Sequence, residues 1–331
     1  MDLGGVLAQS LRVTVRDRRL WLFGFLAALG SGTDLSFRGR LSPDLDTRVD
    51  PRPFFEILRW ILDHLPLFAA GFLAFLFLSL FLALLIALLA VWGQGALILG
   101  AGEALADRPP PLGSIARQAT RRYPRVLGIL LLLGAPGVLM RLFFLFLVII
   151  VLGLVFLFEG REEISRALGV PILCLGGSVL LGCLLPLIWA FHLWSRLALR
   201  AALLEDRPWR EALTQGLRIA RRRIGEVLLL WLVVDVAILG LLTLVLGFAA
   251  SGLFLLFAID TLAPLFREAR QVDLSTLLRG LGVVLLFAIC LSGLSRLLLA
   301  PVLTFVETAW TAAYTTWARP PAAPAGARGS G

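Results

Sequence analysis

The chain has no lysine and only two histidines, so its 31 basic side chains of fixed charge are all arginines. Charged residues make up 16% of the 331 positions and hydrophobic residues 59%. A soluble domain has roughly 25% charged and 45–50% apolar residues. The shortage of charge excludes an ordinary soluble globular protein and predicts a multi-pass membrane protein.

Residues that commonly hold metals or form disulfides are also scarce. The three cysteines, Cys174, Cys183 and Cys290, lie in apolar stretches without the spacing of a metal site, and we interpret them as small core residues. His64 and His192 stand alone in the sequence. The sequence therefore predicts no metal site and no cofactor.

Catalytic motifs are missing as well. No GxSxG, HExxH, Walker or GxGxxG pattern occurs in a context that would support it. The apolar stretches use most of the chain, which leaves no room for a soluble catalytic domain of ordinary size. We predict no catalytic residue and expect that the chain is not an enzyme.

Six long apolar segments dominate the sequence, and they predict an all-α membrane bundle. They are Leu20–Leu29, Leu65–Gly102, Val126–Phe158, Leu168–Ser195, Val227–Ile259 and Gly280–Ala318. The first is too short to cross a hydrocarbon core of about 30 Å unless it is extended by the residues before it. We expect one transmembrane domain over residues 1–318, and a disordered cytoplasmic tail over residues 319–331 because that tail is rich in Pro, Ala and Gly.

One pattern occurs three times, each time before a long apolar stretch: a Gln, an Arg three residues later and a second Arg four residues after that. The three triads are Gln9, Arg12, Arg16; Gln118, Arg121, Arg125; and Gln215, Arg218, Arg222. These offsets fall on one face of a helix. The pattern predicts three repeats, about 1–105, 106–205 and 206–318, each a basic amphipathic helix followed by a transmembrane hairpin.

The triads suggest contact with lipid headgroups. In the third segment Trp209, Leu213 and Ile224 fall on the side opposite the arginines, and in the first Leu3, Leu7 and Leu11 do the same. Such helices can lie in the membrane interface with the apolar face among acyl chains, and guanidinium groups bind phosphate in a bidentate way. We therefore predict that the triads bind membrane lipids, in particular anionic phospholipids.

Other roles for the triads stay open. The arginines can serve only to fix the topology, or they can form a docking face for a protein partner or a second copy of the chain. The pI of about 11 also suggests nucleic-acid binding. We exclude it because the arginines are spread over short loops and no DNA- or RNA-binding module is present.

The distribution of arginine predicts the orientation. With a cytoplasmic N-terminus, 19 of the 31 arginines fall in the inner segments and 10 in the outer loops. Positive charge concentrates on the cytoplasmic side of membrane proteins. We expect a multi-pass protein of the plasma (inner) membrane with both termini in the cytoplasm.

Four charged residues lie within the predicted spans: Arg141, Asp235, Arg296 and Glu307. At 1.5 Å per residue, Asp235 is about 12 Å from the inner start of its span and Arg296 about 24 Å from the outer start of its own, so their depths nearly coincide. The spacing predicts that these two pair, as a buried staple or as part of a substrate or proton path. Arg141 has no evident partner, and Glu307 is expected to reach the inner arginines.

Four stretches carry a family resemblance. They are VTVRDRRLWLFGFLAALGSG (Val13 to Gly32), ALADRPPPLGSIARQATRRYPRVLGILLLLGAPG (Ala104 to Gly137), LALRAALLEDRPWREALTQGLRIARRRIGEVLLLW (Leu197 to Trp231) and ETAWTAAYTTW (Glu307 to Trp317). Together they resemble uncharacterised bacterial six-helix membrane proteins, which are similar to the membrane domain attached to some glycerophosphodiester phosphodiesterases. The resemblance implies a plasma-membrane bundle with lipid- or envelope-related duties. It transfers no catalytic residue, because in that family these belong to a soluble barrel.

Two classes of function follow. The first is a membrane scaffold that organises lipid or a protein partner. The second is a transporter or channel with a path between repeats lined by Arg141, Asp235 and Arg296. Tight packing with paired buried charges favours the scaffold, whereas a polar cavity at the midplane favours transport.

Overall fold

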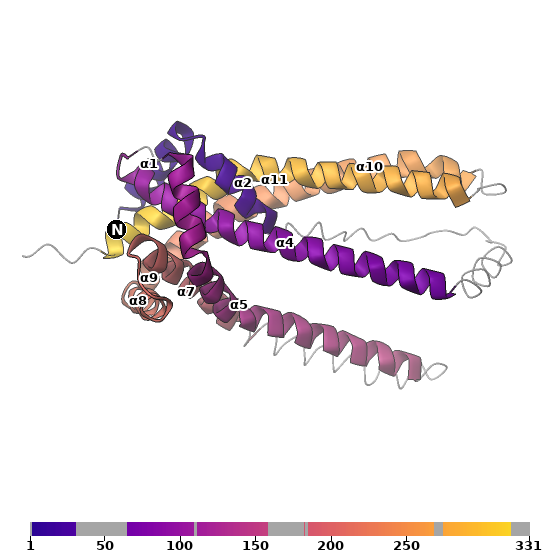
Figure 1. Cartoon of the computed structure of the whole chain (residues 1–331), viewed down its shortest axis with the longest axis horizontal. Coiled ribbons are helices and arrows are strands. Elements are labelled where there is room, and N and C mark those ends of the chain that lie inside the picture. Colours follow the sequence, from indigo (N-terminus) through magenta and orange to yellow (C-terminus); the bar gives the residue numbers. More distant parts are fainter. Residues whose placement is uncertain are drawn as a thin grey trace, which may run out of the picture. The chain divides into compact units, whose positions relative to one another are not determined.

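The structure is a computed structural model that describes residues 2–30, 65–108, 111–157, 182, 185–267 and 274–318. Over these residues the chain is helical and contains no strand, which confirms the all-α prediction (Figure 1). The helices are α1 (Leu3–Arg16), α2 (Leu20–Gly30), α4 (Leu65–Leu105), α5 (Leu112–Leu157), α7 (Leu185–Leu204), α8 (Trp209–Arg222), α9 (Ile224–Trp231), the π-helix η2 (Leu232–Gly240), α10 (Leu241–Arg267) and α11 (Leu274–Ala318).

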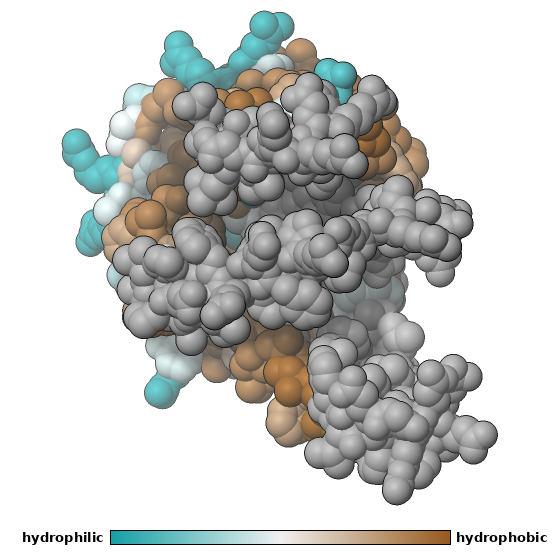
Figure 2. All heavy atoms as spheres, turned by 90° about the vertical axis from the view of Figure 1, so that its right-hand side faces the viewer, coloured by the Kyte–Doolittle hydropathy of each residue, from teal (hydrophilic) through white to brown (hydrophobic). Residues whose placement is uncertain are grey.

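Five helical stretches of the described residues are long and apolar enough to cross a membrane. They are Leu73–Leu105, Leu112–Leu139, Pro186–Leu204, Ile224–Thr261 and Gly282–Ala318. Except in Pro186–Leu204, most of their large apolar side chains face outward, as Phe77 does with 71% of its surface exposed. Figure 2 shows hydrophobic residues over most of the described surface in that view. The chain is a multi-pass membrane protein.

The predicted spans agree with these helices where they can be compared. The first predicted segment forms α2, a shorter apolar helix. Most of the fourth, residues 168–195, lies outside the described residues, as do the loop from residue 31 to 64 and the tail from 319 to 331. Helix α5 continues through Pro124 and Pro136, so neither proline ends the helix.

The chain divides into two compact units. Unit 1 comprises the described parts of Met1–Gly24, Gln94–Leu241 and Pro301–Gly331, and unit 2 those of Phe25–Gly93 and Leu242–Ala300. This division does not follow the predicted repeat boundaries near residues 105 and 205. Each of the three triads lies in unit 1.

Unit 2 contains long helices in close contact. The glycine at Gly93 on α4 lies against α2, where a Cβ would come within 2.9 Å of the Ala27 nitrogen. Helix α10 and the first half of α11 run side by side in Figure 1. Phe257 and Phe287 stack between them with ring centroids 4.0 Å apart.

Unit 1 holds a dense core around the second half of α11. Trp310 and Tyr314 of that helix are almost completely buried, together with Leu197 and Leu203 of α7. The charged residue Arg200 is just as deeply buried. A buried guanidinium requires partners, so its surroundings define the candidate site.

Candidate functional site

Four charged side chains meet in the core of unit 1. Arg196 Nη2 lies 2.8 Å from Asp235 Oδ1, and Arg196 Nη1 lies 3.1 Å from Glu307 Oε1. Arg200 Nη2 lies 2.6 Å from Glu307 Oε2. Each of the four side chains is at most 10% exposed. Two cations and two anions thus form a neutral cluster that joins α7, η2 and α11.

Trp310 completes this cluster. Its indole Nε1 donates to Asp235 Oδ2 at 2.7 Å, and its ring lies 5.6 Å from the guanidinium carbon of Arg196 and 5.8 Å from that of Arg200. Arg200 also donates to the backbone oxygens of Arg196 and Glu307. These contacts occupy both oxygens of each carboxylate. Removal of any one of the four charged side chains would leave a buried charge uncompensated.

The structure gives Asp235 a different partner from the one expected. The depth calculation paired it with Arg296, but Arg196 and Trp310 bind its carboxylate. The calculation failed because Arg196 was assigned to an inner loop, whereas α7 continues to Leu204 and carries it into the core. The expectation that Glu307 meets inner arginines is confirmed.

Two further charged residues were predicted within the spans, Arg296 and Arg141. Arg296 lies in the unit 2 part of α11, and its Nε is buried without a hydrogen-bond partner among the described residues. Arg141 belongs to α5, and its side chain lies outside the described part of the chain.

Sequence reasoning missed Arg196, Arg200 and Trp310. A signal was present, because Arg196 and Arg200 are four residues apart and therefore share a helix face. They directly follow an apolar run, so they were counted with the topology-determining arginines. No sequence pattern pointed to Trp310.

Two further acidic residues accept hydrogen bonds from the C-terminal end of α11. Tyr314 donates to Glu205 Oε1 at 2.5 Å, just past the end of α7. Trp317 Nε1 donates to Glu226 Oε2 at 2.7 Å, and Arg223 of the α8–α9 junction pairs with the same carboxylate at 2.8 Å. The C-terminal turns of α11 are thereby held against two other helices of unit 1.

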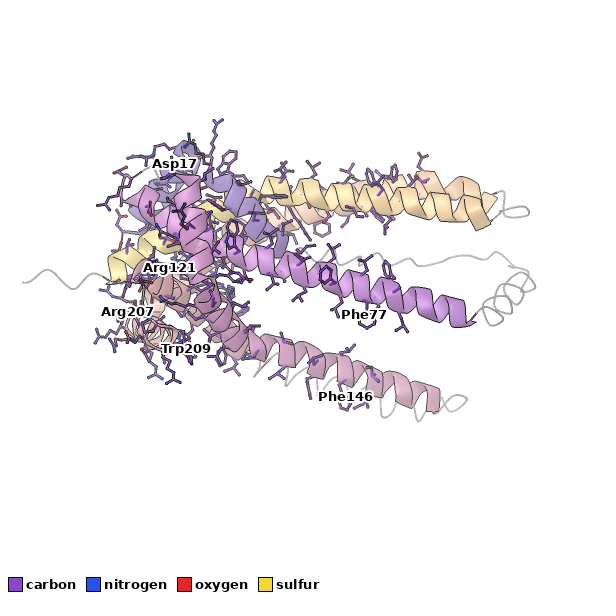
Figure 3. All side chains as sticks on the ribbon, in the orientation of Figure 1. Asp17, Phe77, Arg121, Phe146, Arg207 and Trp209 are labelled. Atoms are coloured by element: carbon purple, nitrogen blue, oxygen red, sulfur yellow. The ribbon has the colours of Figure 1, made fainter. Side chains whose placement is uncertain are left out.

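The three triads lie on α1, on the first half of α5 and on α8. The arginines Arg12, Arg16, Arg121, Arg125, Arg218 and Arg222 are exposed, as is Gln9, whereas Gln118 and Gln215 are half-buried. In Figure 3, Asp17, Arg121, Arg207 and Trp209 lie at one end of α5, and Phe146 lies toward the other. The basic segments of unit 1 thus gather at one end of its long apolar helix.

One stripe of α8 packs against α7. Leu213, Gly216 and Ile219 are buried, and a Cβ on Gly216 would lie 2.7 Å from the backbone nitrogen of Ala198 on α7. Trp194 of α7 donates to the Leu213 carbonyl at 2.8 Å. Of the expected apolar face only Leu213 is covered by α7, whereas Trp209 and Ile224 are 44% and 54% exposed.

In helix α1, too, the buried residues differ from the expected apolar face. Its buried stripe is Val6, Ser10, Val13 and Thr14, whereas Leu11 of the expected apolar face is 55% exposed. Ser10 and Thr14 are buried because each hydroxyl donates to a carbonyl four residues earlier. The residue after the Gln of each triad is small and buried: Ser10, Ala119 or Gly216.

In two triads, the last arginine forms an ion pair with an aspartate just past the end of another helix. Arg16 Nη1 pairs with Asp107 at 3.0 Å just past α4, and Arg125 Nη1 pairs with Asp206 at 2.7 Å just past α7. Both aspartates have positive φ, 55° and 52°, a conformation that Asp tolerates better than most residues. The hydrogen bond from Arg16 to Asp107, followed by the charge of Asp17, raises the pKa of the Arg16 guanidinium.

The described residues include no group of three or more His, Cys, Asp or Glu side chains that could hold a metal ion. Comparison with protein-family models, curated proteins and solved structures gave no match for this chain.

Proposed function

We propose that this protein is a membrane scaffold that gathers anionic phospholipids through the exposed arginines of α8. The observation that carries the proposal is the division of the arginines into two sets. Arg196 and Arg200 are buried and neutralised by carboxylates. Arg221 and Arg222 are exposed and have no acidic partner within the part of the chain that the structure describes.

The position of α8 supports a lipid partner. Arg222 ends the helix, and the apolar stretch Ile224–Thr261 begins two residues later. Guanidinium groups placed there would lie at the depth of the phosphates. Each basic residue near an anionic membrane surface contributes about 1 kcal/mol of attraction. Trp209 is also exposed and lies under Arg210 at 5.1 Å, as expected of an aromatic residue at the interface.

The buried cluster supports a scaffold in preference to a transport path. Asp235 already accepts from Arg196 and Trp310, and Glu307 from Arg196 and Arg200. A carboxylate with both oxygens occupied has little capacity for a passing ion or proton. We assign the cluster a structural role, in which it holds α7, η2 and α11 together so that α8 keeps a fixed position on α7.

The proposed orientation has the basic end of unit 1 on the cytoplasmic side of the inner membrane, with both termini there. The excess of arginine in the predicted inner segments supports this orientation. The resemblance to the membrane domain of glycerophosphodiester phosphodiesterases agrees with a lipid-related duty, in a protein that we propose is not an enzyme.

The test is lipid retention by the purified full chain. The double variant Arg218→Gln and Arg222→Gln is compared with the native protein by native mass spectrometry after extraction from membranes containing phosphatidylglycerol and phosphatidylcholine. We expect several-fold less phosphatidylglycerol on the variant and unchanged phosphatidylcholine. Arg279→Gln, in a predicted outer loop, is the single-charge control. Unchanged phosphatidylglycerol retention in the double variant would contradict the proposal.

A further inference from the structure

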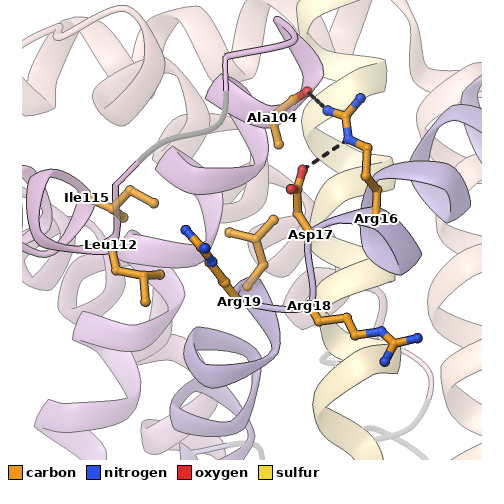
Figure 4. Close-up of a pocket in the computed structure, with 8 residues that line it drawn as sticks. Arg16, Asp17, Arg18, Arg19, Ala104, Leu112 and Ile115 are labelled. Atoms are coloured by element: carbon orange, nitrogen blue, oxygen red, sulfur yellow. Dashed lines mark hydrogen bonds and ion pairs between the residues drawn. The ribbon is translucent and has the colours of Figure 1, made fainter.

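A cavity lies where α1 turns into α2 within unit 1. It has a volume of about 380 Å³. It is lined by Arg16, Asp17, Arg18, Arg19, Leu20, Ala104, Leu112 and Ile115 (Figure 4). We propose that this cavity binds a phosphate group carried by an amphipathic molecule. The inference extends the proposed function to a second, specific site and rests on it only for the expectation that the ligand comes from the membrane.

The three arginines of the cavity differ in how far they are already engaged. Arg16 is bound by Asp107 and Asp17 and donates to the Ala104 carbonyl. Arg18 lies over Trp21 at 5.9 Å from the ring centroid. Arg19 is exposed and has no acidic partner among the described residues. In Figure 4 its side chain extends toward Leu112, while Arg18 points away.

The carboxylate of the cavity does not cancel this charge. Asp17 Oδ2 lies 3.5 Å from Arg16 Nε and accepts no hydrogen bond among the described residues, so Asp17 offsets one of the three positive charges. Arg18 and Arg19 remain as net positive charge in the lining. An arginine whose guanidinium N–H groups have no other acceptor can donate to two phosphate oxygens at once.

The start of α5 adds a second source of positive potential. Leu112 is both the first residue of α5 and part of the lining. The amides of Ser114 and Ile115 donate to the Pro111 carbonyl and form the first turn of the helix. The positive end of the helix dipole therefore lies at the lining, and it attracts anions.

The opposite side of the cavity is apolar. Leu20, Ala104 and Ile115 are at least 98% buried and contribute hydrocarbon to the lining. A free phosphate ion would gain nothing from this surface, whereas an attached apolar body would. The volume lies within the range of about 300–1,000 Å³ typical of small-ligand cavities.

The location matches the depth of a headgroup. Arg18 and Arg19 directly precede Leu20, where the apolar helix α2 begins. The second triad is followed directly by an apolar residue, Val126, and the third by a single further arginine, Arg223. Of the three triads, only the first is therefore followed by a pair of arginines, Arg18 and Arg19, directly before the apolar helix.

The test measures binding of short-chain phosphatidic acid to the full chain in a neutral detergent, by isothermal titration calorimetry. We expect Arg19→Gln to weaken binding about tenfold or more, because a charge-assisted hydrogen bond is lost. Arg19→Lys keeps the charge but loses the bidentate geometry. Its affinity for the lipid is expected to lie between that of the native chain and that of Arg19→Gln. Arg117→Gln on α5 is the matched control, because that side chain is exposed, belongs to none of the triads and does not line the cavity. Its affinity is expected to match that of the native chain.

Glycerol 3-phosphate and inorganic phosphate form a second arm of the experiment. If they bind as tightly as the lipid and with the same dependence on Arg19, the cavity is a phosphate site but the proposed amphipathic ligand is overturned. If Arg19→Gln binds the lipid with the affinity of the native chain, or with the affinity of Arg117→Gln, the cavity proposal is overturned. Loss of binding only in the Arg218→Gln and Arg222→Gln variant would overturn it too, while leaving the proposed function of α8 supported.

Discussion

Arg200 and Glu307 form an ion pair of 2.6 Å between α7 and α11, and both side chains are buried. The two residues are 107 positions apart in sequence. Their contact belongs to a neutral cluster, so the stability of unit 1 depends on keeping every charge in it matched. Four predictions examine this cluster and the contacts around it.

Replacement of Glu307 by Gln is expected to destabilise unit 1 strongly. The amide has nearly the same shape but no charge, so the guanidinium of Arg200 is left without an anion in the core. Breaking a buried ion pair in this way costs about 3–5 kcal/mol. Thermal unfolding in detergent measures the loss. Glu211→Gln on the exposed side of α8 is the control, and equal melting of the two variants would contradict this role of Glu307.

Replacement of Asp235 by Asn is expected to cost less than replacement of Glu307. The amide oxygen can still accept from the Trp310 indole, and Arg196 keeps Glu307 as a partner. Combining Asp235→Asn with Arg196→Gln is expected to be less damaging than the sum of the single changes, because the pair is removed together. A stable Asp235→Asn variant with altered solute flux in proteoliposomes would instead indicate transport.

Replacement of Gly216 by Ala is expected to separate α8 from α7. The new Cβ would meet the backbone of Ala198 at 2.7 Å, and backbone atoms cannot move aside as a side chain can. Overpacking of this kind costs about 1–3 kcal/mol. Gly225→Ala is the matched control, because nothing lies within 4 Å of its Cβ position. Equal unfolding temperatures for the two variants would contradict the close contact of α8 with α7.

Replacement of Asp206 tests the contact at the end of α7. Asp206→Gly removes the ion pairs with Arg122 and Arg125 but suits the positive φ, and exposed pairs contribute about 0–1 kcal/mol. Asp206→Ala loses the pairs and is also strained, so we expect it to be about 1 kcal/mol less stable than the Gly variant. Denaturant titration compares the two. Equal stabilities of the Gly and Ala variants would show that the positive φ at position 206 does not affect the free energy of unfolding.

Much of the fold follows from the sequence. Long uncharged stretches predict membrane helices because the bilayer leaves the backbone few alternatives. The triads predicted helices where α1 and α8 lie, and in α8 Arg218 and Arg222 are exposed while Gln215 beside them is half-buried. These features are local, and helical periodicity alone determines them.

The candidate site was harder to predict because it depends on contacts between distant segments. The wheel of α8 identified Leu213 as apolar but did not show whether lipid or α7 covers it. Counting 1.5 Å per residue placed Asp235 in a regular α-helix, whereas it lies in the π-helix η2. Its partner Arg196 looked like a topology signal because a charge next to an apolar run gives the same pattern whether it is buried or exposed.

The central claim is that the three basic helices lie on one face of the membrane, the cytoplasmic one. The native cysteines Cys174, Cys183 and Cys290 are first replaced by Ser. Arg12→Cys, Arg121→Cys and Arg218→Cys are then made one at a time in this background. Each variant is treated with a membrane-impermeant maleimide. The account predicts that all three label in inside-out vesicles and none in intact cells. Labelling of any one of them from the opposite side to the other two would contradict it.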